Sequence, residues 1–192
     1  VQKFISEWNT DILFACEIRD LEAFKSLELD YPYRAVTDIL RTEDENPDLP
    51  QQGIGVLSRI PWENIWTLDF SALPLTEDKP SRGILAVQFK TPSGKLLTCY
   101  AVHLKSNRGG IEVTQIRRQR AVDYLRWDWN RKGLNPEEDW IVVLGDFNTS
   151  IEDPAFEADQ TLNYLMSFGF LHGGDGLPRD ERLTIHGGRY PA

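Results

Sequence analysis

The chain has 192 residues, of which 41% are hydrophobic and 27% charged, so it can form a core and is not disordered as a whole. This length predicts one domain over residues 1–192. The net charge of −9 argues against a generally basic surface that would grip nucleic acid, and no apolar run approaches the roughly 20 residues of a membrane span.

The first part of the chain alternates the patterns of helices and strands. Apolar spacing, charge and proline positions predict, in order, a helix over 1–9, a strand over 11–17, a helix over 21–29, a loop over 41–52 and a strand over 53–58. The next segment, 62–70, is expected to pair with the strand 53–58. Its aromatic residues are interpreted as core packing, with a membrane or substrate contact as the alternative.

A hairpin and a long helix are predicted in the middle of the chain. Residues 83–89 and 96–104 flank the turn sequence TPSG (91–94), which is typical of a β-hairpin. Residues 111–130 have helical spacing, with a predicted apolar stripe of Val113, Ile116, Val122, Leu125 and Trp129.

The segment WIVVLGDFNT (140–149) is the most informative stretch of the sequence. Its run of five apolar residues predicts a strand covered on both faces, after which Gly145 ends the run and Asp146 and Asn148 follow. A short helix over 162–168 and a glycine-rich loop over 173–182 are expected next. Strands paired as hairpins and interrupted by helices indicate an α+β fold with a mixed sheet.

Two further residue groups carry expectations. Cys16 and Cys99 lie in apolar, strand-like runs and are expected to be free thiols, with one disulfide as the alternative. A set of basic residues around the long helix is interpreted as a solvated helix face, with a local basic patch as the alternative: Lys105, Arg108, Arg117, Arg118 and Arg120.

Polar side chains follow three of the predicted strands, where a rigid frame positions accessible groups. Glu17 ends the first strand, His103 lies at the end of the second hairpin strand, and Asp146 and Asn148 follow the apolar run at 140–144. Each of them alone is typical of a turn or a cap, but together they suit one site. An oxygen ligand such as Glu17 suits Mg²⁺, with Mn²⁺ as a possible substitute, and this ion binds substrate phosphates.

The same residue types suggest how a phosphate ester would be attacked. Asp146 is suited to orient or deprotonate water, Asn148 to donate to a phosphate oxygen, and His103 to stabilise developing charge. Three further residues are candidates for contacts to the phosphate: Lys105, Ser106 and Arg82.

Four segments together resemble the endonuclease/exonuclease/phosphatase superfamily of DNase I-like proteins: DILFACE (11–17), GIGVLS (53–58), YAVHLKS (100–106) and VLGDFN (143–148). The resemblance implies a four-layer α/β/β/α sandwich with the site at one end of the two sheets. It implies Glu17 as the metal ligand, His103 and Ser106 beside the scissile phosphate, and Asp146 and Asn148 around the attacking water.

The family pattern also includes a first strand that ends in a functional Asn, and two last strands with an Asp and an Asp-His pair. This sequence does not contain them, so a fragment truncated at both ends is expected, and the chain alone is expected to hydrolyse phosphodiesters poorly. His172 and His186 are not expected to replace the missing His. The expected substrate is a nucleic acid, lipid or sugar phosphate, and no protein partner is predicted. A catalytically inactive binding module and a plain structural domain are the alternatives.

Overall fold

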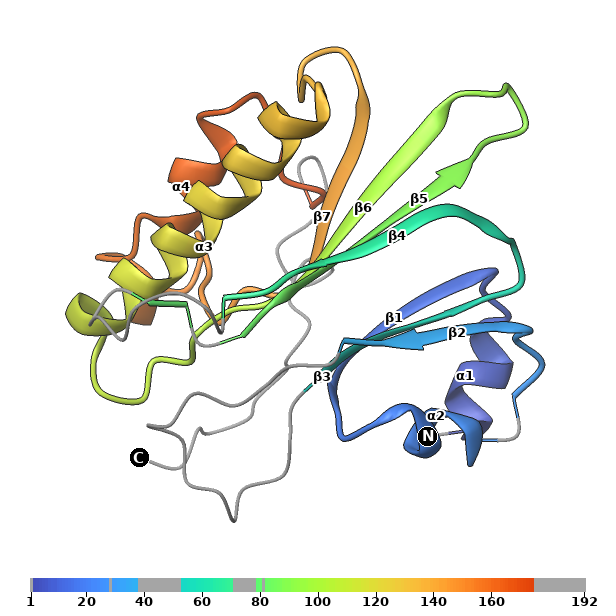
Figure 1. Cartoon of the computed structure of the whole chain (residues 1–192). Helices are drawn as coiled ribbons and strands as arrows, with labels where there is room; N and C mark the ends of the chain where they lie inside the picture. Colours follow the sequence, from blue (N-terminus) through green and yellow to red (C-terminus); the bar gives the residue numbers. More distant parts are fainter. Residues whose placement is uncertain (1, 28, 38–52, 71–78, 81, 175–192) are drawn as a thin grey trace.

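The computed structural model describes residues 2–27, 29–37, 53–70, 79–80 and 82–174. In these residues two β-sheets face each other, and helices cover the outer face of each sheet (Figure 1). The predicted α+β class and the α/β/β/α order of layers are therefore confirmed.

The first sheet is antiparallel, with strand order β1-β3-β2. All six residues of β3 are buried because the strand lies between its two neighbours and between two layers. The strands and the helices beside them have these bounds: β1 (Ile12–Ile18), β2 (Tyr33–Val36), β3 (Gly53–Ser58), α1 (Gln2–Trp8) and α2 (Leu21–Lys25).

The second sheet is mixed, with strand order β4-β5-β6-β7. Its first three strands are antiparallel neighbours, and β6 and β7 run parallel. The 22-residue helix α3 crosses from the end of β6 back to the start of β7, as a parallel pair requires. The bounds are β4 (Trp62–Leu68), β5 (Ile84–Lys90), β6 (Leu96–His103), α3 (Ile111–Lys132), β7 (Trp140–Asp146), the 3-10 turn η1 (Pro154–Phe156) and α4 (Thr161–Met166).

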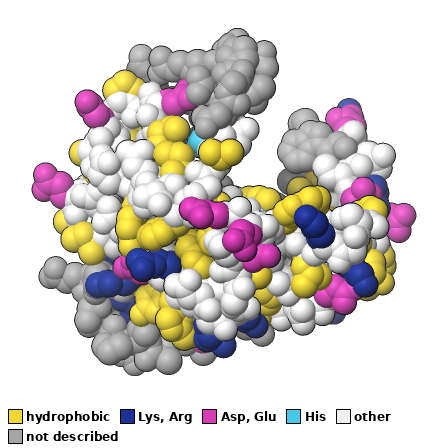
Figure 2. Space-filling model, turned by 90° about the horizontal axis from the view of Figure 1, so that it is seen from above, with side chains coloured by type: hydrophobic (Ala, Val, Ile, Leu, Met, Phe, Trp, Pro, Cys, Tyr) yellow, Lys and Arg dark blue, Asp and Glu magenta, His cyan; other side chains and the backbone are white. Residues whose placement is uncertain are grey.

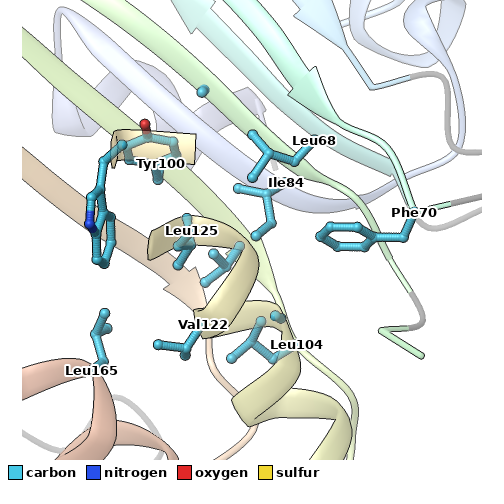
Figure 3. Close-up of a cluster of buried hydrophobic side chains, with 12 residues drawn as sticks. Leu68, Phe70, Ile84, Tyr100, Leu104, Val122, Leu125 and Leu165 are labelled. Carbon is cyan, nitrogen blue, oxygen red and sulfur yellow. The ribbon is translucent and has the colours of Figure 1, made fainter. Parts of the chain in front are cut away.

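Three apolar cores hold the four layers together. The core between the first sheet and its helices includes Phe24 and Leu57. The core between the two sheets includes Ile54, Val87 and Phe89. The third core packs the second sheet against α3 and α4 (Figure 3). Its buried residues include Leu68, Ile84, Tyr100, Leu104, Val122, Leu125 and Leu165.

The structure corrects the predicted partner of residues 62–70. Strand β4 pairs with β5 in the second sheet, whereas both edges of β3 are already occupied by β1 and β2. The chain changes sheets at residues 59–61, next to Pro61. Strand β2 was not predicted, and the helix expected over 21–29 ends at Lys25.

The predicted apolar stripe of the long helix is correct only in its second half. Val122, Leu125 and Trp129 are buried, but Val113 and Ile116 are 56% and 48% exposed. Val113 and Val122 are nine residues apart, which at about 100° per residue places them on opposite sides of a helix.

The apolar run before Asp146 does form a strand, but it is not covered on both faces. Among the strands of the described residues, β7 lies at the edge of its sheet, and Trp140 and Val142 are 47% and 42% exposed. Cys16 and Cys99 are free thiols, as expected. The loop expected over 41–52 and most of the one over 173–182 lie outside the described residues. Within the described part of the chain, no helix has both the length and the apolar character to cross a membrane.

Gly55 has no room for a side chain. A Cβ atom there would lie 2.2 Å from Cε2 of Phe24, whose side chain is only 1% exposed. We therefore expect Gly55→Ala to lower the free energy of unfolding by about 2 kcal/mol, measured by urea denaturation, because overpacking a tight core costs about 1–3 kcal/mol. Gly173→Ala is the control, since no atom lies within 4 Å of the added Cβ. Equal stability of the two variants would contradict this account of Gly55.

Candidate active site

Polar side chains from both sheets meet at one end of the molecule. In the parallel pair β6–β7, His103 is in register with Asp146, so both lie at the carboxyl edge of the second sheet. Strand β1 reaches the same place from the first sheet, where the Cys16 thiol donates a weak hydrogen bond to the Val102 carbonyl at 3.5 Å. The residue after Cys16 is Glu17.

Glu17 is placed by an irregularity in β1 rather than by the end of the strand. The pairing of β1 with β3 shifts register between Ala15 and Ile18, and Glu17 has a φ of +61°. A β-bulge of this kind re-aims a side chain. The prediction that the strand ends on Glu17 is therefore corrected: Glu17 lies in a bulge, and the strand continues to Ile18.

His103 lies between the two carboxylates. Its Nε2 is 3.8 Å from Asp146 Oδ2 and 4.0 Å from Glu17 Oε1. The imidazole is only 3% exposed, while the carboxylate side chains are 53% and 64% exposed, so the two acids face solvent above a buried imidazole. No described residue gives His103 Nδ1 a hydrogen-bond partner.

The environment of His103 favours its neutral form. Burial lowers the pKa of His103 below its ordinary value, and the positive charge of Arg82 lowers the pKa further. The charges of Asp146 and Glu17 act in the opposite direction but do not reverse the shift. At neutral pH the imidazole is therefore uncharged, and it carries one N–H donor.

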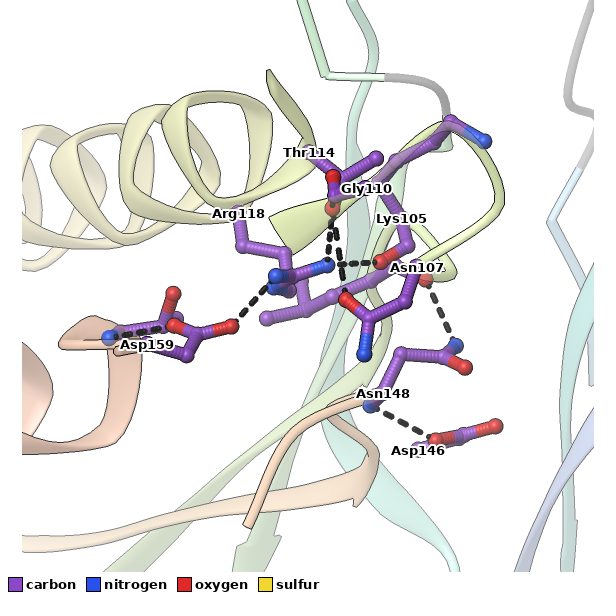
Figure 4. Close-up of polar contacts among 10 residues, drawn as sticks. Lys105, Asn107, Gly110, Thr114, Arg118, Asp146, Asn148 and Asp159 are labelled. Carbon is purple, nitrogen blue, oxygen red and sulfur yellow. Dashed lines mark hydrogen bonds and ion pairs between the residues drawn. The ribbon is translucent and has the colours of Figure 1, made fainter. Parts of the chain in front are cut away.

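Asn148 is fixed by two hydrogen bonds. Its backbone N–H donates to Asp146 Oδ1 at 2.8 Å, and its side-chain Nδ2 donates to the Leu104 carbonyl at 2.9 Å (Figure 4). Arg82 Nη1 donates to the same carbonyl at 2.9 Å, and Leu104 N–H donates to the Asp146 carbonyl at 2.8 Å. Leu104 thus joins Arg82 to Asp146 and Asn148, which lie much later in the sequence.

Backbone strain is concentrated at this site. Only three non-glycine residues in the described part of the chain have a positive φ, and two of them are Glu17 and Asn148, at +61° and +51°. Such conformations cost energy, persist only when the surroundings enforce them, and cluster at functional sites.

The structure gathers Glu17, His103, Asp146, Asn148 and Arg82, as the site hypothesis requires. The other two candidates, Lys105 and Ser106, follow Leu104 directly and are half-buried at the start of the loop between β6 and α3. The Lys105 carbonyl accepts a hydrogen bond at 2.7 Å from Arg118, which holds this part of the loop against the helix.

The predicted exposure of Arg118 is wrong. The residue was expected on a solvated helix face, but its side chain is 0% exposed and forms an ion pair with the equally buried Asp159 (Figure 4). A signal was present in the sequence, because Arg118 precedes Val122, Leu125 and Trp129 by four, seven and eleven residues, which is the spacing of one helix face. Arg120, in contrast, lies on the surface and pairs with Asp123.

The donor set suits a hard divalent cation held partly by water and substrate. In the part of the chain that the structure describes, no three His, Cys, Asp or Glu side chains are arranged to hold a metal ion. Glu17 and Asp146 are nevertheless solvent-facing carboxylates on either side of His103. Mg²⁺ binds through one or two carboxylates, several waters and substrate phosphates rather than in an all-protein cage, so these residues fit it.

Comparisons with known proteins support the fold. No protein-family model and no curated protein sequence matches the chain. Sphingomyelinase C from Streptomyces griseocarneus is similar in structure with a TM-score of 0.64 and 18% identity, over 91% of this chain and 63% of that one. An endonuclease/exonuclease/phosphatase from Beutenbergia cavernae gives a TM-score of 0.59 and 17% identity, over 88% and 46%.

The human Nocturnin catalytic domain, solved with a bound sulfate anion, is also similar, with a TM-score of 0.56 and 17% identity over 84% of this chain and 60% of that one. This chain thus spans about half to three fifths of the length of these structures. The likenesses establish the fold: the chain has the DNase I-like fold, as the four sequence segments predicted.

Gly145 allows the close approach of β7 to β6 immediately before Asp146. Its φ is +123°, and a Cβ atom would lie 2.1 Å from the Val102 carbonyl oxygen. We expect Gly145→Ala to destabilise the fold by about 3 kcal/mol or more, because it combines backbone strain with a clash against backbone atoms. It should also shift the backbone amide NMR signals of His103 and Asp146.

Gly133→Ala is the matched control for this variant. Gly133 also has a positive φ, +69°, but no atom lies within 4 Å of an added Cβ, so only backbone strain of about 1–2 kcal/mol is expected there. If both variants lost the same free energy of unfolding, the close approach at Gly145 would not matter.

The electrostatics of His103 give a titration prediction. In metal-free buffer, NMR titration of His103 should give a pKa below that of an ordinary histidine. Arg82→Gln should raise the pKa, because it removes a positive charge that disfavours the imidazolium. Arg120→Gln, which changes an exposed arginine paired with Asp123, should leave it unchanged. A lower pKa in Arg82→Gln would contradict the assignment.

Proposed function

We propose that the chain carries the site of a metal-dependent phosphoesterase that cleaves phosphate esters by direct attack of water. One observation carries this proposal: a buried His103 lies within 4.0 Å of carboxylates from both sheets, beside an asparagine and an arginine that share one carbonyl. These groups suit the recognition of a phosphate and the activation of water. The names of the structural relatives, a sphingomyelinase and an endonuclease/exonuclease/phosphatase, denote enzymes that act on phosphate esters.

Each residue has a chemical task in this proposal. Asp146 orients the attacking water and takes its proton. Asn148 uses one N–H on Leu104 and has the other for a phosphate oxygen. The N–H of neutral His103 donates to a second phosphate oxygen and stabilises the charge that develops there, and Arg82 adds positive charge beside it.

Glu17 would hold Mg²⁺, or Mn²⁺ in its place, and the bound ion would polarise the phosphoryl group and neutralise part of its charge. Lys105 and Ser106 are assigned to further contacts with the substrate phosphate.

Attack by water is favoured over a covalent intermediate on the available thiol. Cys16 lies next to Glu17, but burial raises the pKa of its thiol, and the charges of Asp146 and Glu17 also oppose the thiolate. A protonated thiol is a poor nucleophile. Cys16 is therefore given no catalytic task.

The distribution of charged side chains on the surface bears on the substrate class. On the face seen in Figure 2, acidic and basic side chains are interspersed with apolar ones rather than gathered by charge. With a net charge of −9, this distribution disfavours a broad grip on long nucleic acid, which relies on clustered Lys and Arg. We favour a small phosphodiester or a lipid or sugar phosphate, with nucleic acid as the alternative. A second candidate function is a binding module that recognises phosphate esters without cleaving them.

Hydrolysis of an aryl phosphodiester with Mg²⁺ or Mn²⁺ tests the proposal. Because the chain spans only part of the length of the similar structures, the assay uses both this chain and the longest product of its gene. We expect metal-dependent turnover in the longer protein and little in the chain alone. Asp146→Asn should reduce turnover by about 10²–10⁴-fold, as expected for loss of a general base.

Two further variants separate metal binding from general charge effects. Glu17→Gln should raise the Mg²⁺ concentration needed for half-maximal activity. Glu63→Gln, which removes an exposed carboxylate on β4 at the far edge of the second sheet, should not. The proposal would be contradicted if hydrolysis continued in the presence of a chelator or in the Asp146→Asn variant. Saturable binding of the ester without turnover would favour the binding module.

A further inference from the structure

A fully buried arginine lies directly behind the candidate site. Arg118 of α3 is 0% exposed and pairs with Asp159, which precedes α4 and whose side chain is equally buried. Burying such a pair costs several kcal/mol per ion before the mutual attraction is counted, and apolar side chains of similar size often serve stability as well or better. Arg118 lies on the apolar stripe of α3, where a Leu or Met side chain would also pack. Stability alone therefore does not explain the pair.

Asp159 holds one side of the guanidinium in place. It accepts a hydrogen bond from Arg118 Nη2, and it also accepts one from the Thr161 backbone N–H at 2.9 Å. Burial opposes the charged carboxylate, but the hydrogen bonds with Thr161 and the charge of Arg118 outweigh it and lower the pKa of Asp159. The carboxylate is therefore ionised at neutral pH, and it fixes both the guanidinium and the start of α4.

The other side of the guanidinium reaches the loop between β6 and α3. Arg118 Nη1 donates to the Lys105 carbonyl at 2.7 Å and to the Thr114 hydroxyl at 3.1 Å. That hydroxyl lies 2.8 Å from the Gly110 carbonyl and 3.3 Å from Asn107 Oδ1. One side chain thus links the beginning and the end of the loop, as Figure 4 shows.

Two successive carbonyls of this loop are therefore held by different parts of the protein. The Leu104 carbonyl accepts from Arg82 and Asn148, and the Lys105 carbonyl accepts from Arg118. Because each peptide unit is planar, holding both carbonyls sets the directions of the N–H groups of residues 105 and 106. It also fixes the point at which the Lys105 and Ser106 side chains leave the backbone.

We infer that the Arg118–Asp159 pair positions the loop between β6 and α3. By holding the Lys105 carbonyl, the pair fixes Lys105, Ser106 and Asn148 in the orientation in which they contact the substrate phosphate. The inference rests on the proposed phosphoesterase function. Arg118 contacts no reacting atom in this scheme and acts only through the loop. Its benefit lies in preorganisation, since a displacement of about 1 Å at a reacting centre can cost about 10²-fold in rate.

Variants of graded severity test the inference. Arg118→Lys keeps the charge but cannot make the forked contacts to Asp159 and Lys105 together. Thr114→Val retains shape and removes only the hydroxyl between Arg118 and the loop. Asp159→Asn removes the charge that fixes the guanidinium. The control is Asp128→Asn, which alters an equally buried carboxylate on the same helix that accepts from Trp66, Tyr100 and Arg131. It lies ten residues from Arg118, about 15 Å along the helix.

Two readouts are taken for each folded variant: the NMR signals of the backbone amides of residues 105–107 and of the Asn148 side-chain amide, and kcat and KM with the aryl phosphodiester in the longest gene product. In Arg118→Lys and Asp159→Asn we expect the loop signals to move and kcat to fall about 10–100-fold, with a smaller change in KM. Thr114→Val should act in the same direction more weakly. Asp128→Asn should lower the melting temperature without either effect.

The inference is overturned if the loop signals stay in place in Arg118→Lys and Thr114→Val, or if Asp128→Asn moves them as much. If Arg118→Lys and Asp159→Asn do not fold, Thr114→Val alone decides, because it leaves the ion pair intact. The NMR readout needs no turnover. Absence of hydrolysis in the unmodified protein would therefore count against the proposed function, while the loop signals would still test the positioning role.

Discussion

The parallel pairing of β6 with β7 is the constraint on which the candidate site depends. It brings His103 level with Asp146, and Gly145 makes it possible because its missing side chain lets the strand approach the Val102 backbone. Everything beyond the strand ends is then fixed by short links, above all the hydrogen bonds at the Leu104 carbonyl. Hydrogen bonds to backbone groups, including the one from Asn148 N–H to Asp146, position most of these polar groups, so the two acids can face solvent and keep their placement.

The α+β class with a mixed sheet, and the polar residues at the ends of the strands, could be predicted from the sequence because both are encoded locally. The four-layer arrangement was predicted only from the resemblance of the four segments to DNase I-like proteins. The motif segments around Glu17, His103 and Asp146 each combine an apolar run with a polar residue just beyond or within it, and the structure gathers them. The hairpin β5–β6 followed from its turn sequence. The strand and hairpin predictions need only periodicity and turn residues within a short stretch of sequence. Glu17 lies in a different sheet from His103 and Asp146, so a site shared between the two sheets was expected only from the resemblance.

The predictions that were wrong concern features that the residues near each helix or strand do not determine. The partner of β4 depends on which sheet edges are already filled, a property of the whole chain. The bulge at Glu17 depends on how β1 meets β3. Arg118 was misjudged because a charged residue in a helix is usually solvated, and only the distant Asp159 makes its burial possible. The apparent continuity of Val113 with Val122 had a simpler cause, since the two lie on opposite faces of one helix.

The contacts that shape the site also say when it forms during folding. Cys16 and Val102 are 86 positions apart, Leu104 and Asn148 are 44 apart, and Arg118 and Asp159 are 41 apart. Closing such long loops lowers the conformational entropy of the chain before the contacts can contribute any stabilising free energy. Helix α3 and the β5–β6 hairpin, built from neighbouring residues, are ready earlier. We therefore expect the site to assemble late, after the strands that carry its residues have paired.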